Sequence, residues 1–234
     1  MLKFAYVAAM RVVGAPLRAI GLLDRMERAP RDSLSFWLAS LFAIYDVRRL
    51  IQLDVPWWSF PAIDIVERWL AGRQEGVRAF EYGSGASTVW LARRCRSVVS
   101  VEHDAKFLHD AMPLLARDNV ELRLVAPERC PSPRIRSARK GHEQDDFSAY
   151  VDAIGTDCYD LIVIDGRARD ACLERAEGQL APGGLIVFDN SERRRYAGAL
   201  ARVRLPMQRF RGLAPALPYP SETTLAGALQ EAAR

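Results

Sequence analysis

Hydrophobic and polar positions follow two different patterns along the chain, and the pattern changes near residue 75. From Val77 onward, short runs rich in β-branched residues alternate with helical segments. Strand, helix and strand repeated in this order predict a parallel sheet with helices on both faces. The predicted strands are residues 78–82, 97–102, 120–125, 159–164 and 184–188, and the predicted helices lie near residues 87–95, 104–117, 147–154, 169–180 and 191–203.

The C-terminal stretch offers two further short strands, around residues 206–211 and 222–227, separated by proline and glycine. We expect them to form an antiparallel pair at the edge of the sheet. The predicted fold is therefore α/β and Rossmann-like, with a doubly wound, mostly parallel seven-stranded sheet. The segment 127–146 is rich in proline, arginine and charge, which indicates either a mobile lid or a loose insertion.

Before residue 75 the pattern is helical, which predicts an N-terminal extension over residues 1–74 and a Rossmann-like domain over residues 75–234. Residues 2–26 are almost wholly apolar, and we expect Pro16 to kink this helix. The exceptions fall on one helical stripe, namely Lys3, Arg11, Arg18 and Arg25. Two interpretations stay open: a helix on an anionic membrane surface, or a helix that packs on the domain or on a second subunit in a homodimer.

Two more helices are predicted in the extension. One follows the capping candidates Asp32 and Ser33. The other begins at Ser59 and Pro61 and ends at Gly72. We expect these helices and the 127–146 segment to cover a site at the sheet edge and to select its ligand.

Composition excludes several classes of protein. No apolar run approaches the roughly 20 residues of a membrane span, and no cleavable signal pattern is present, so we expect a cytoplasmic protein. The four cysteines form no C-x-x-C pair, which speaks against a zinc site or a disulfide framework. The net charge is +4, but the arginines are dispersed without a reader motif, so no nucleic-acid partner is expected.

Acidic residues and glycines follow the predicted strands. Ligands bind at the carboxyl ends of the strands in a doubly wound sheet, so these positions are the candidate site. They are Glu81, Gly83, Gly85 and Ser87 around the first strand end, Glu102 after the second, Asp165 after the fourth, and Asp189 with Asn190 after the fifth.

The first turn resembles a dinucleotide-binding turn with one departure. Gly83 and Gly85 allow a sharp turn and close approach of a ligand, but Thr88 stands where the third glycine would be. Glu81 would also lie unfavourably near a bound anion. Both features favour a ligand with a positive charge over a diphosphate.

Glu102 lies nineteen residues after Gly83, at the end of a predicted strand. A carboxylate at that place accepts both hydroxyls of a ribose. The alternative is that Glu102 only caps the helix that begins at Asp104.

Four segments together resemble motifs one, two, four and five of the class I S-adenosylmethionine-dependent methyltransferases: FEYGSGASTVWLA, SVVSVEHD, YDLIVIDGRAR and LAPGGLIVFDN. The resemblance covers roughly residues 75–225. It implies that Gly83 and Gly85 line the methionine part of S-adenosylmethionine, that Glu81 lies near its ammonium group, and that Glu102 holds its ribose. Ser87 and Asp165 complete the cofactor residues that we predict.

A narrower resemblance links the chain to cation-dependent O-methyltransferases. There, an Asp after the fourth strand and an Asp-Asn pair after the fifth bind a divalent metal, which implies a Mg²⁺ site at Asp165, Asp189 and Asn190. The match is incomplete, because Ala168, flanked by two arginines, replaces the lysine of those enzymes. Either the metal suffices, a group such as His103 or His142 is the base, or the arginines bind an anionic substrate.

The predicted catalytic residues are Asp165, Arg167 and His103. The predicted reaction is S-adenosylmethionine-dependent methyl transfer to a small-molecule or glycan acceptor, with an oxygen favoured over a nitrogen as the methyl acceptor. Two alternatives stay open. One is an NAD(P)-dependent oxidoreductase, which Thr88 and Glu81 disfavour; the other is a non-catalytic Rossmann-like binding module at a membrane surface or subunit interface.

Overall fold

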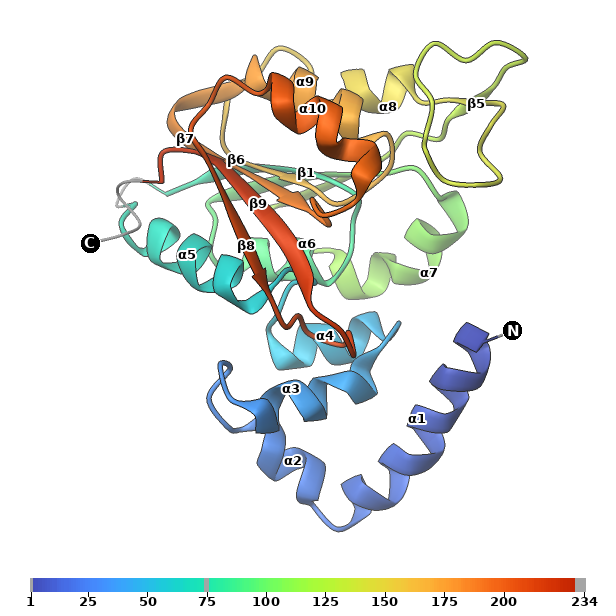
Figure 1. Ribbon diagram of the computed structural model, residues 1–234, viewed down its shortest axis with the longest axis vertical. Helices are drawn as coiled ribbons and strands as arrows, with labels where there is room; N and C mark the ends of the chain where they lie inside the picture. Colours follow the sequence, from blue (N-terminus) through green and yellow to red (C-terminus); the bar gives the residue numbers. More distant parts are fainter. Residues whose placement is uncertain (1, 74–75, 230–234) are drawn as a thin grey trace.

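The computed structural model describes residues 2–73 and 76–229, without the side chains of residues 2–9 and 11. Its main sheet has seven strands in the order β3-β2-β1-β6-β7-β9-β8 (Figure 1). The first five of these run parallel, whereas β9 pairs antiparallel with both β7 and β8. The strands are β1 Arg78–Tyr82, β2 Ser97–Glu102, β3 Val120–Leu124, β6 Tyr159–Ile164, β7 Leu180–Asp189, β8 Met207–Gly212 and β9 Ser221–Gly227. The predicted doubly wound, mostly parallel seven-stranded sheet is confirmed.

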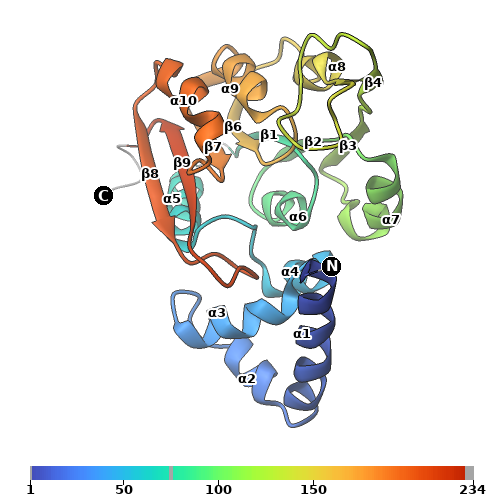
Figure 2. The same cartoon turned by 45° about the vertical axis from the view of Figure 1, so that its right-hand side comes forward.

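Helices cover both faces of the sheet (Figures 1 and 2). One face carries α5 Phe60–Ala71, α6 Ala86–Ala92 and α7 Ala105–Leu115, and the other carries α8 Ser148–Asp152, α9 Arg169–Glu177 and α10 Ala197–Arg202. Alternate residues of a central strand therefore enter different cores: Leu161 and Val163 pack with α5 and α6, whereas Ile162 and Ile164 pack with α8 and α9. This two-sided burial is why the strands read as unbroken apolar runs.

The C-terminal elements differ in detail from the prediction. The expected helix at 191–203 is a 3₁₀ turn, η2 Arg194–Tyr196, followed by the short α10. Inside the 127–146 segment, β4 Glu128–Arg129 and β5 Asp145–Asp146 form a small antiparallel ribbon that the sequence pattern does not predict.

The N-terminal extension contains more breaks than predicted. The expected helix over residues 2–26 is two helices, α1 Leu2–Ala19 and α2 Leu22–Glu27, and the break is at Gly21, with a φ of 71°, rather than at Pro16. Glycine adopts this left-handed conformation without steric cost. Arg18 of the predicted basic stripe pairs with Asp24 and Glu27, while the side chains of Lys3 and Arg11 lie outside the described residues.

The helix predicted after Ser33 is also divided. Its parts are α3 Leu34–Ser40, the 3₁₀ turn η1 Leu41–Ala43 and α4 Val47–Leu53. Ser33 caps α3 as expected, because its hydroxyl accepts from the backbone N–H of Phe36. Tyr45 then takes a positive φ of 56°, and Asp46 caps α4. Ser59 stands before α5 but does not cap it, since its hydroxyl donates to the carbonyl of Phe210.

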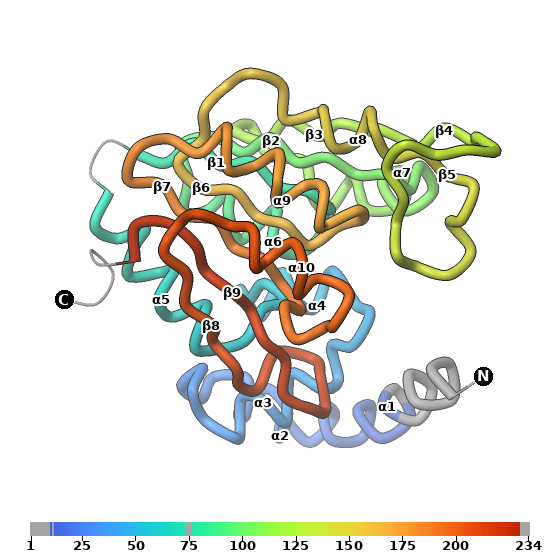
Figure 3. Tube along the Cα trace, turned by 45° about the horizontal axis from the view of Figure 1, so that its top comes forward, coloured from blue at the N-terminus to red at the C-terminus, as the bar shows by residue number. Residues whose placement is uncertain are grey.

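The extension shares a core with the sheet. Leu50 and Trp58 belong to the same buried cluster as Ala79 and Leu161, and Trp58 meets Trp90 of α6 edge-to-face with ring centroids 5.4 Å apart. The helix α1 extends away from the sheet (Figures 1 and 2), although its Met10 packs against the same buried cluster. In Figure 3, β8 and β9 lie side by side at the edge of the sheet. No helix among the described residues combines the length and the hydropathy needed to cross a bilayer. Membrane contact through residues 2–26 and a homodimer stay predictions.

Candidate functional site

The turns after β1 and β6 touch each other backbone to backbone. Gly83 has a φ of 97°, and a Cβ there would lie 2.6 Å from the Cα of Gly166 and 2.7 Å from its nitrogen. Its N–H donates to the carbonyl of Val101 on β2, at 2.8 Å. Gly83 is therefore required by the fold itself, because it brings three strand ends together.

Gly85 differs, although it lies only two residues away. Its φ of 178° is extended backbone, and a Cβ there would meet only the Ser87 hydroxyl, at 4.0 Å. Protein packing does not demand a glycine at this position. Close approach of a ligand to the backbone is the remaining reason for it, and this role stays a prediction.

Thr88 closes the turn in place of a third glycine. Its hydroxyl oxygen accepts from the backbone N–H of Gly85, at 2.9 Å, and its own N–H donates to the Gly85 carbonyl. This reciprocal arrangement caps α6 in the manner of a capping box. The departure from the dinucleotide pattern is thus a structural part of the helix start.

Glu81 is fully buried beneath this turn. Its carboxylate accepts from the hydroxyls of Ser87 and Thr88, each at 2.5 Å, and of Ser100 on β2, at 2.6 Å. Burial raises the pKa of Glu81 to about 7, although the three hydroxyls oppose the shift. The Ser87 hydroxyl and the Glu81 carboxylate thus hydrogen-bond each other, and the predicted roles of both residues at the cofactor stay predictions.

Glu102 ends β2 and is also buried, with 4% of its surface exposed. One carboxylate oxygen, Oε1, accepts from the backbone N–H groups of His103 and Asp104, at 2.7 and 2.9 Å. The other, Oε2, accepts from the N–H of Ser84 in the glycine turn, at 3.2 Å. A carboxylate offers about four lone pairs, so Oε2 keeps capacity for a further donor. Asp104 caps α7 by accepting from the N–H of Phe107, while Glu102 accepts from the two N–H groups just before the helix, so both the ribose role and the capping role of Glu102 stay open.

His103 follows Glu102 in the chain, and its ring contacts the Glu102 carboxylate. Its Nδ1 is 2.5 Å from Glu102 Oε1, and its ring is packed near His142 and Phe147, with centroids 6.2 and 6.0 Å away. His142 in turn contacts Asp145 at 2.7 Å. Neither histidine lines the cavity at the ends of β6 and β7 described below. The predicted role of His103 as a base in methyl transfer therefore has no geometric support.

The acids after β6 and β7 converge on one guanidinium. Arg169 is buried, with 6% of its surface exposed. Its Nη2 lies 2.6 Å from Asp165 Oδ1, and its Nη1 lies 3.8 Å from Asp189 Oδ2 and 3.4 Å from Asn190 Oδ1. It also donates to the backbone carbonyls of Asp165, Gly166 and Asp189. The three predicted metal ligands are thus brought together around Arg169.

This donor set does not fit Mg²⁺. A magnesium ion requires near-octahedral oxygen coordination, and the guanidinium already holds the three groups with a positive charge of its own. Asp189 is further engaged by the hydroxyl of Thr223, at 2.9 Å, and burial together with the charge of Asp165 raises its pKa to about 8. Within the described residues, no group of three or more His, Cys, Asp or Glu side chains is placed to hold a metal.

Beside these acids lies a cavity of about 350 Å³. Five of its twelve lining residues are arginines: Arg139, Arg167, Arg169, Arg193 and Arg195. Both Arg167 and Arg169 were expected as arginines that could bind an anionic substrate, but the ion pair of Arg169 with the strand-end acids was not predicted. The spacing of four residues between Asp165 and Arg169, across the start of a helix, is the signal that could have indicated an ion pair.

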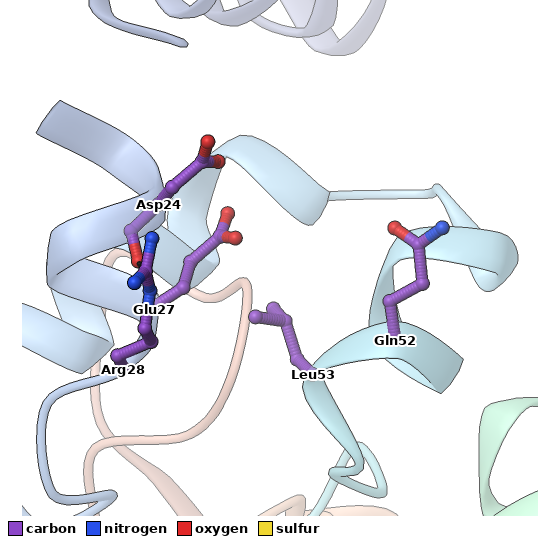
Figure 4. A pocket seen from close by; sticks show the side chains of 5 residues that line it. All are labelled: Asp24, Glu27, Arg28, Gln52 and Leu53. Carbon is purple, nitrogen blue, oxygen red and sulfur yellow. Dashed lines mark hydrogen bonds between the residues drawn. The ribbon is translucent and has the colours of Figure 1, made fainter. Parts of the chain in front are cut away.

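A second groove, of about 380 Å³, lies between α2 and α4 (Figure 4). It is lined by Asp24, Glu27, Arg28, Gln52 and Leu53. Its lining comes entirely from the extension and includes none of the predicted site residues. Glu27 is moreover paired with Arg18 and Arg49.

No family model and no curated protein matches the chain. Solved structures do share its fold. An O-methyltransferase from Bacillus cereus in complex with S-adenosylhomocysteine has 18% identity and a TM-score of 0.52, over 77% of this chain and 89% of that one. The O-methyltransferase TomG from Streptomyces achromogenes, in complex with S-adenosylmethionine, has 20% identity and a TM-score of 0.50, over 80% and 88%. The chain therefore has the Rossmann-like fold of class I S-adenosylmethionine-dependent methyltransferases.

The same fold also occurs with another reaction. A precorrin-8W decarboxylase from Methanobacterium thermoautotrophicum has 16% identity and a TM-score of 0.50, over 74% of this chain and 93% of that one. The fold by itself does not decide the chemistry, which has to be argued from the site.

Proposed function

We propose that this chain transfers the methyl group of S-adenosylmethionine to an oxygen of a small-molecule or glycan acceptor. The observation that carries the proposal is the hydrogen bond that the N–H of Ser84, in the glycine turn, donates to Glu102. It holds a carboxylate with spare acceptor capacity next to the turn that contains the half-buried Gly85, where we expect a ribose and a methionine moiety to lie side by side.

S-Adenosylmethionine supplies a methyl group already activated on a sulfonium. The acceptor oxygen forms a bond to the methyl carbon as the carbon–sulfur bond breaks, and S-adenosylhomocysteine leaves. The protein contributes mainly by holding the two reactants in line at near-contact distance. Its fixed parts are the turn at Gly83 and the β6 turn that abuts it.

In this proposal, Asp165 receives the acceptor's proton. It follows β6 directly beside the Gly83 turn, and its side chain is 20% exposed. One oxygen, Oδ1, pairs with Arg169, while no described residue donates to Oδ2. Burial raises the pKa of Asp165, and a carboxylate with a raised pKa is the better base near neutral pH. Arginine stays protonated, so Arg167 and Arg169 do not serve as bases.

Calorimetry with S-adenosylhomocysteine and with NADH tests the proposal. We expect the parent protein to bind S-adenosylhomocysteine and not NADH. Glu102→Ala should weaken that binding at least tenfold, or about 1.4 kcal/mol. Glu121→Ala removes an exposed carboxylate on the neighbouring β3 and is the matched control, with binding unchanged.

Binding of NADH without S-adenosylhomocysteine would favour the oxidoreductase alternative. If the folded protein binds neither ligand, the alternative of a non-catalytic Rossmann-like binding module would be favoured. Equal affinities of Glu102→Ala and the parent would remove the ribose assignment.

A further inference from the structure

The arginine-lined cavity adjoins the proposed cofactor site. Gly166 to Arg169, which follow β6, and Asn190, which follows β7, form its floor, and the 127–146 segment contributes Ser137 to Arg139. Gly166 is also the residue that abuts Gly83. The cavity therefore opens beside the turn that would hold the reactive part of S-adenosylmethionine, where an acceptor has to lie.

The charge of this cavity is strongly positive and mostly unpaired. Arg169 is neutralised by Asp165 and Asp189. The four other arginines form no salt bridge at contact distance among the described residues: Arg139, Arg167, Arg193 and Arg195. Arg193 nevertheless lies close enough to Asp165 for its charge to oppose the rise in the pKa of that carboxyl. No aspartate or glutamate is among the described lining residues.

One of these arginines has a buried donor without a partner, and another lies over an aromatic ring. The Nε of Arg167 is buried without a hydrogen-bond partner among the described residues, and the guanidinium of Arg195 lies 4.9 Å from the ring centroid of Tyr196. A buried donor without a partner costs free energy that a ligand's acceptor oxygen would recover.

The backbone around the cavity is strained. Among the described residues, five that are not glycine have a positive φ, and three of these line the cavity: Tyr45 at 56°, Ala168 at 46° and Asn190 at 55°. The left-handed conformation is unfavourable for residues such as tyrosine and alanine, and residues held in it are found preferentially at ligand sites. The strain and the unpaired charge thus point independently to the same place.

We infer that this cavity binds an anionic group on the acceptor, of the phosphate, sulfate or carboxylate class, and so selects an anionic small molecule for methylation. The inference rests on the proposed function. A volume of about 350 Å³ lies near the lower end of small-molecule sites, which run from about 300 to 1,000 Å³. The fork of a guanidinium matches the oxygens of all three anions in a bidentate manner.

The test is calorimetry on protein saturated with S-adenosylhomocysteine, at constant ionic strength. Inorganic phosphate, sulfate and acetate compare the three anions, and phenyl phosphate is compared with its neutral counterpart phenol. We expect at least one anion to bind, and phenyl phosphate to bind at least tenfold more tightly than phenol.

Two variants locate the anion. The double variant Arg139→Gln with Arg193→Gln should bind phenyl phosphate at least tenfold more weakly than the parent, and its affinity for S-adenosylhomocysteine should be unchanged. Two exposed arginines outside the cavity, changed in Arg68→Gln combined with Arg117→Gln, provide a control of equal charge, which should leave both affinities at the parent values.

Equal losses in the two double variants would overturn the inference, because the effect would then come from net charge alone. Tighter binding of a short RNA than of phenyl phosphate would overturn it as well, in favour of a polyanion site. Failure of the proposed function is distinguishable, since S-adenosylhomocysteine itself would then not bind.

Discussion

The two halves of the candidate site carry opposite charge along one edge of one sheet. At the ends of β1 and β2, the charged side chains are Glu81 and Glu102, and they are held by hydroxyls and backbone N–H groups. At the ends of β6 and β7, acids are present too, but a buried guanidinium holds them and further arginines surround them. The edge therefore suits a cationic ligand on one side and an anionic one on the other.

The difference lies in how each half compensates a buried carboxylate. Hydroxyls and backbone N–H groups add no positive charge to the first half, so under the proposed function its carboxylates would attract the sulfonium and ammonium of S-adenosylmethionine. Arg169 cancels the charge of the second half and leaves the other arginines in excess. This separation would keep cofactor and acceptor in their own halves, and each prediction below tests one side of it.

Removing Arg169 should have the largest effect. In Arg169→Ala, two acids remain buried without their cation, and breaking a buried pair in this way costs about 3–5 kcal/mol of unfolding free energy. Arg202→Ala, which removes an exposed pair with Glu174, is the control and should cost at most about 1 kcal/mol. Chemical denaturation measures both, and a loss in Arg169→Ala no greater than that in the control would contradict the central place of Arg169.

The glycine turn supplies the next prediction. Gly83→Ala should lose about 3–4 kcal/mol of stability, because the new Cβ meets the Gly166 backbone and alanine disfavours the positive φ. Gly85→Ala should change stability by less than about 1 kcal/mol, since a Cβ there meets only the Ser87 hydroxyl, at 4.0 Å. Gly85→Ala should instead weaken the binding of S-adenosylhomocysteine at least tenfold.

Denaturation and calorimetry on the two variants separate these roles. If Gly85→Ala bound S-adenosylhomocysteine like the parent, the ligand would not approach that backbone. If it unfolded as readily as Gly83→Ala, the contrast between the two glycines would be lost.

Much of the first half could be predicted from the sequence, because its determinants are local. A buried parallel strand reads as an apolar run, and the turn glycines and Glu102 lie at fixed places after such runs. The hydrogen bonding of the buried Glu81 carboxylate was harder to predict from the sequence, because one of its donors is Ser100 on the neighbouring strand. The register of two strands brings these groups together, and no local pattern contains it.

The second half depended more on tertiary structure. Asp165 and Asp189 could be found as strand-end acids, but their meeting at Arg169 follows from the pairing of β6 with β7. The breaks of the extension were missed for a related reason. Tyr45 adopts a left-handed conformation that its residue type disfavours, so only the surrounding packing sets it.

Glu81 provides a pH-dependent test of the first half. Its pKa is about 7 in the folded protein against 4.5 for the unfolded chain, so between these pH values the unfolded state loses its proton first. Glu81 should therefore contribute a fall in stability of about 3 kcal/mol as pH rises from about 4.5 to about 7, in addition to the fall contributed by Asp189, whose pKa is also raised. Glu81→Gln cannot lose a proton and should lack the contribution of Glu81.

Denaturation of parent and Glu81→Gln at pH 4.5 and pH 8 gives the difference directly. Asp118→Asn, at an exposed acid, is the control and should retain the pH dependence of the parent. An identical pH profile in Glu81→Gln would mean that its carboxylate is not held as the structure has it.

The smallest expected effect is that of removing divalent metal, because Arg169 already holds the three groups that a magnesium ion would need. Treatment with a chelator should leave both the affinity for S-adenosylhomocysteine and the melting temperature unchanged, and calorimetry with Mg²⁺ or Mn²⁺ should show no site at Asp165 and Asp189. Saturable binding of Mn²⁺ that Asp189→Asn abolishes would restore the predicted metal site. It would also mean that the arginine leaves its two acids when the ion arrives, so the second half would carry a switchable charge.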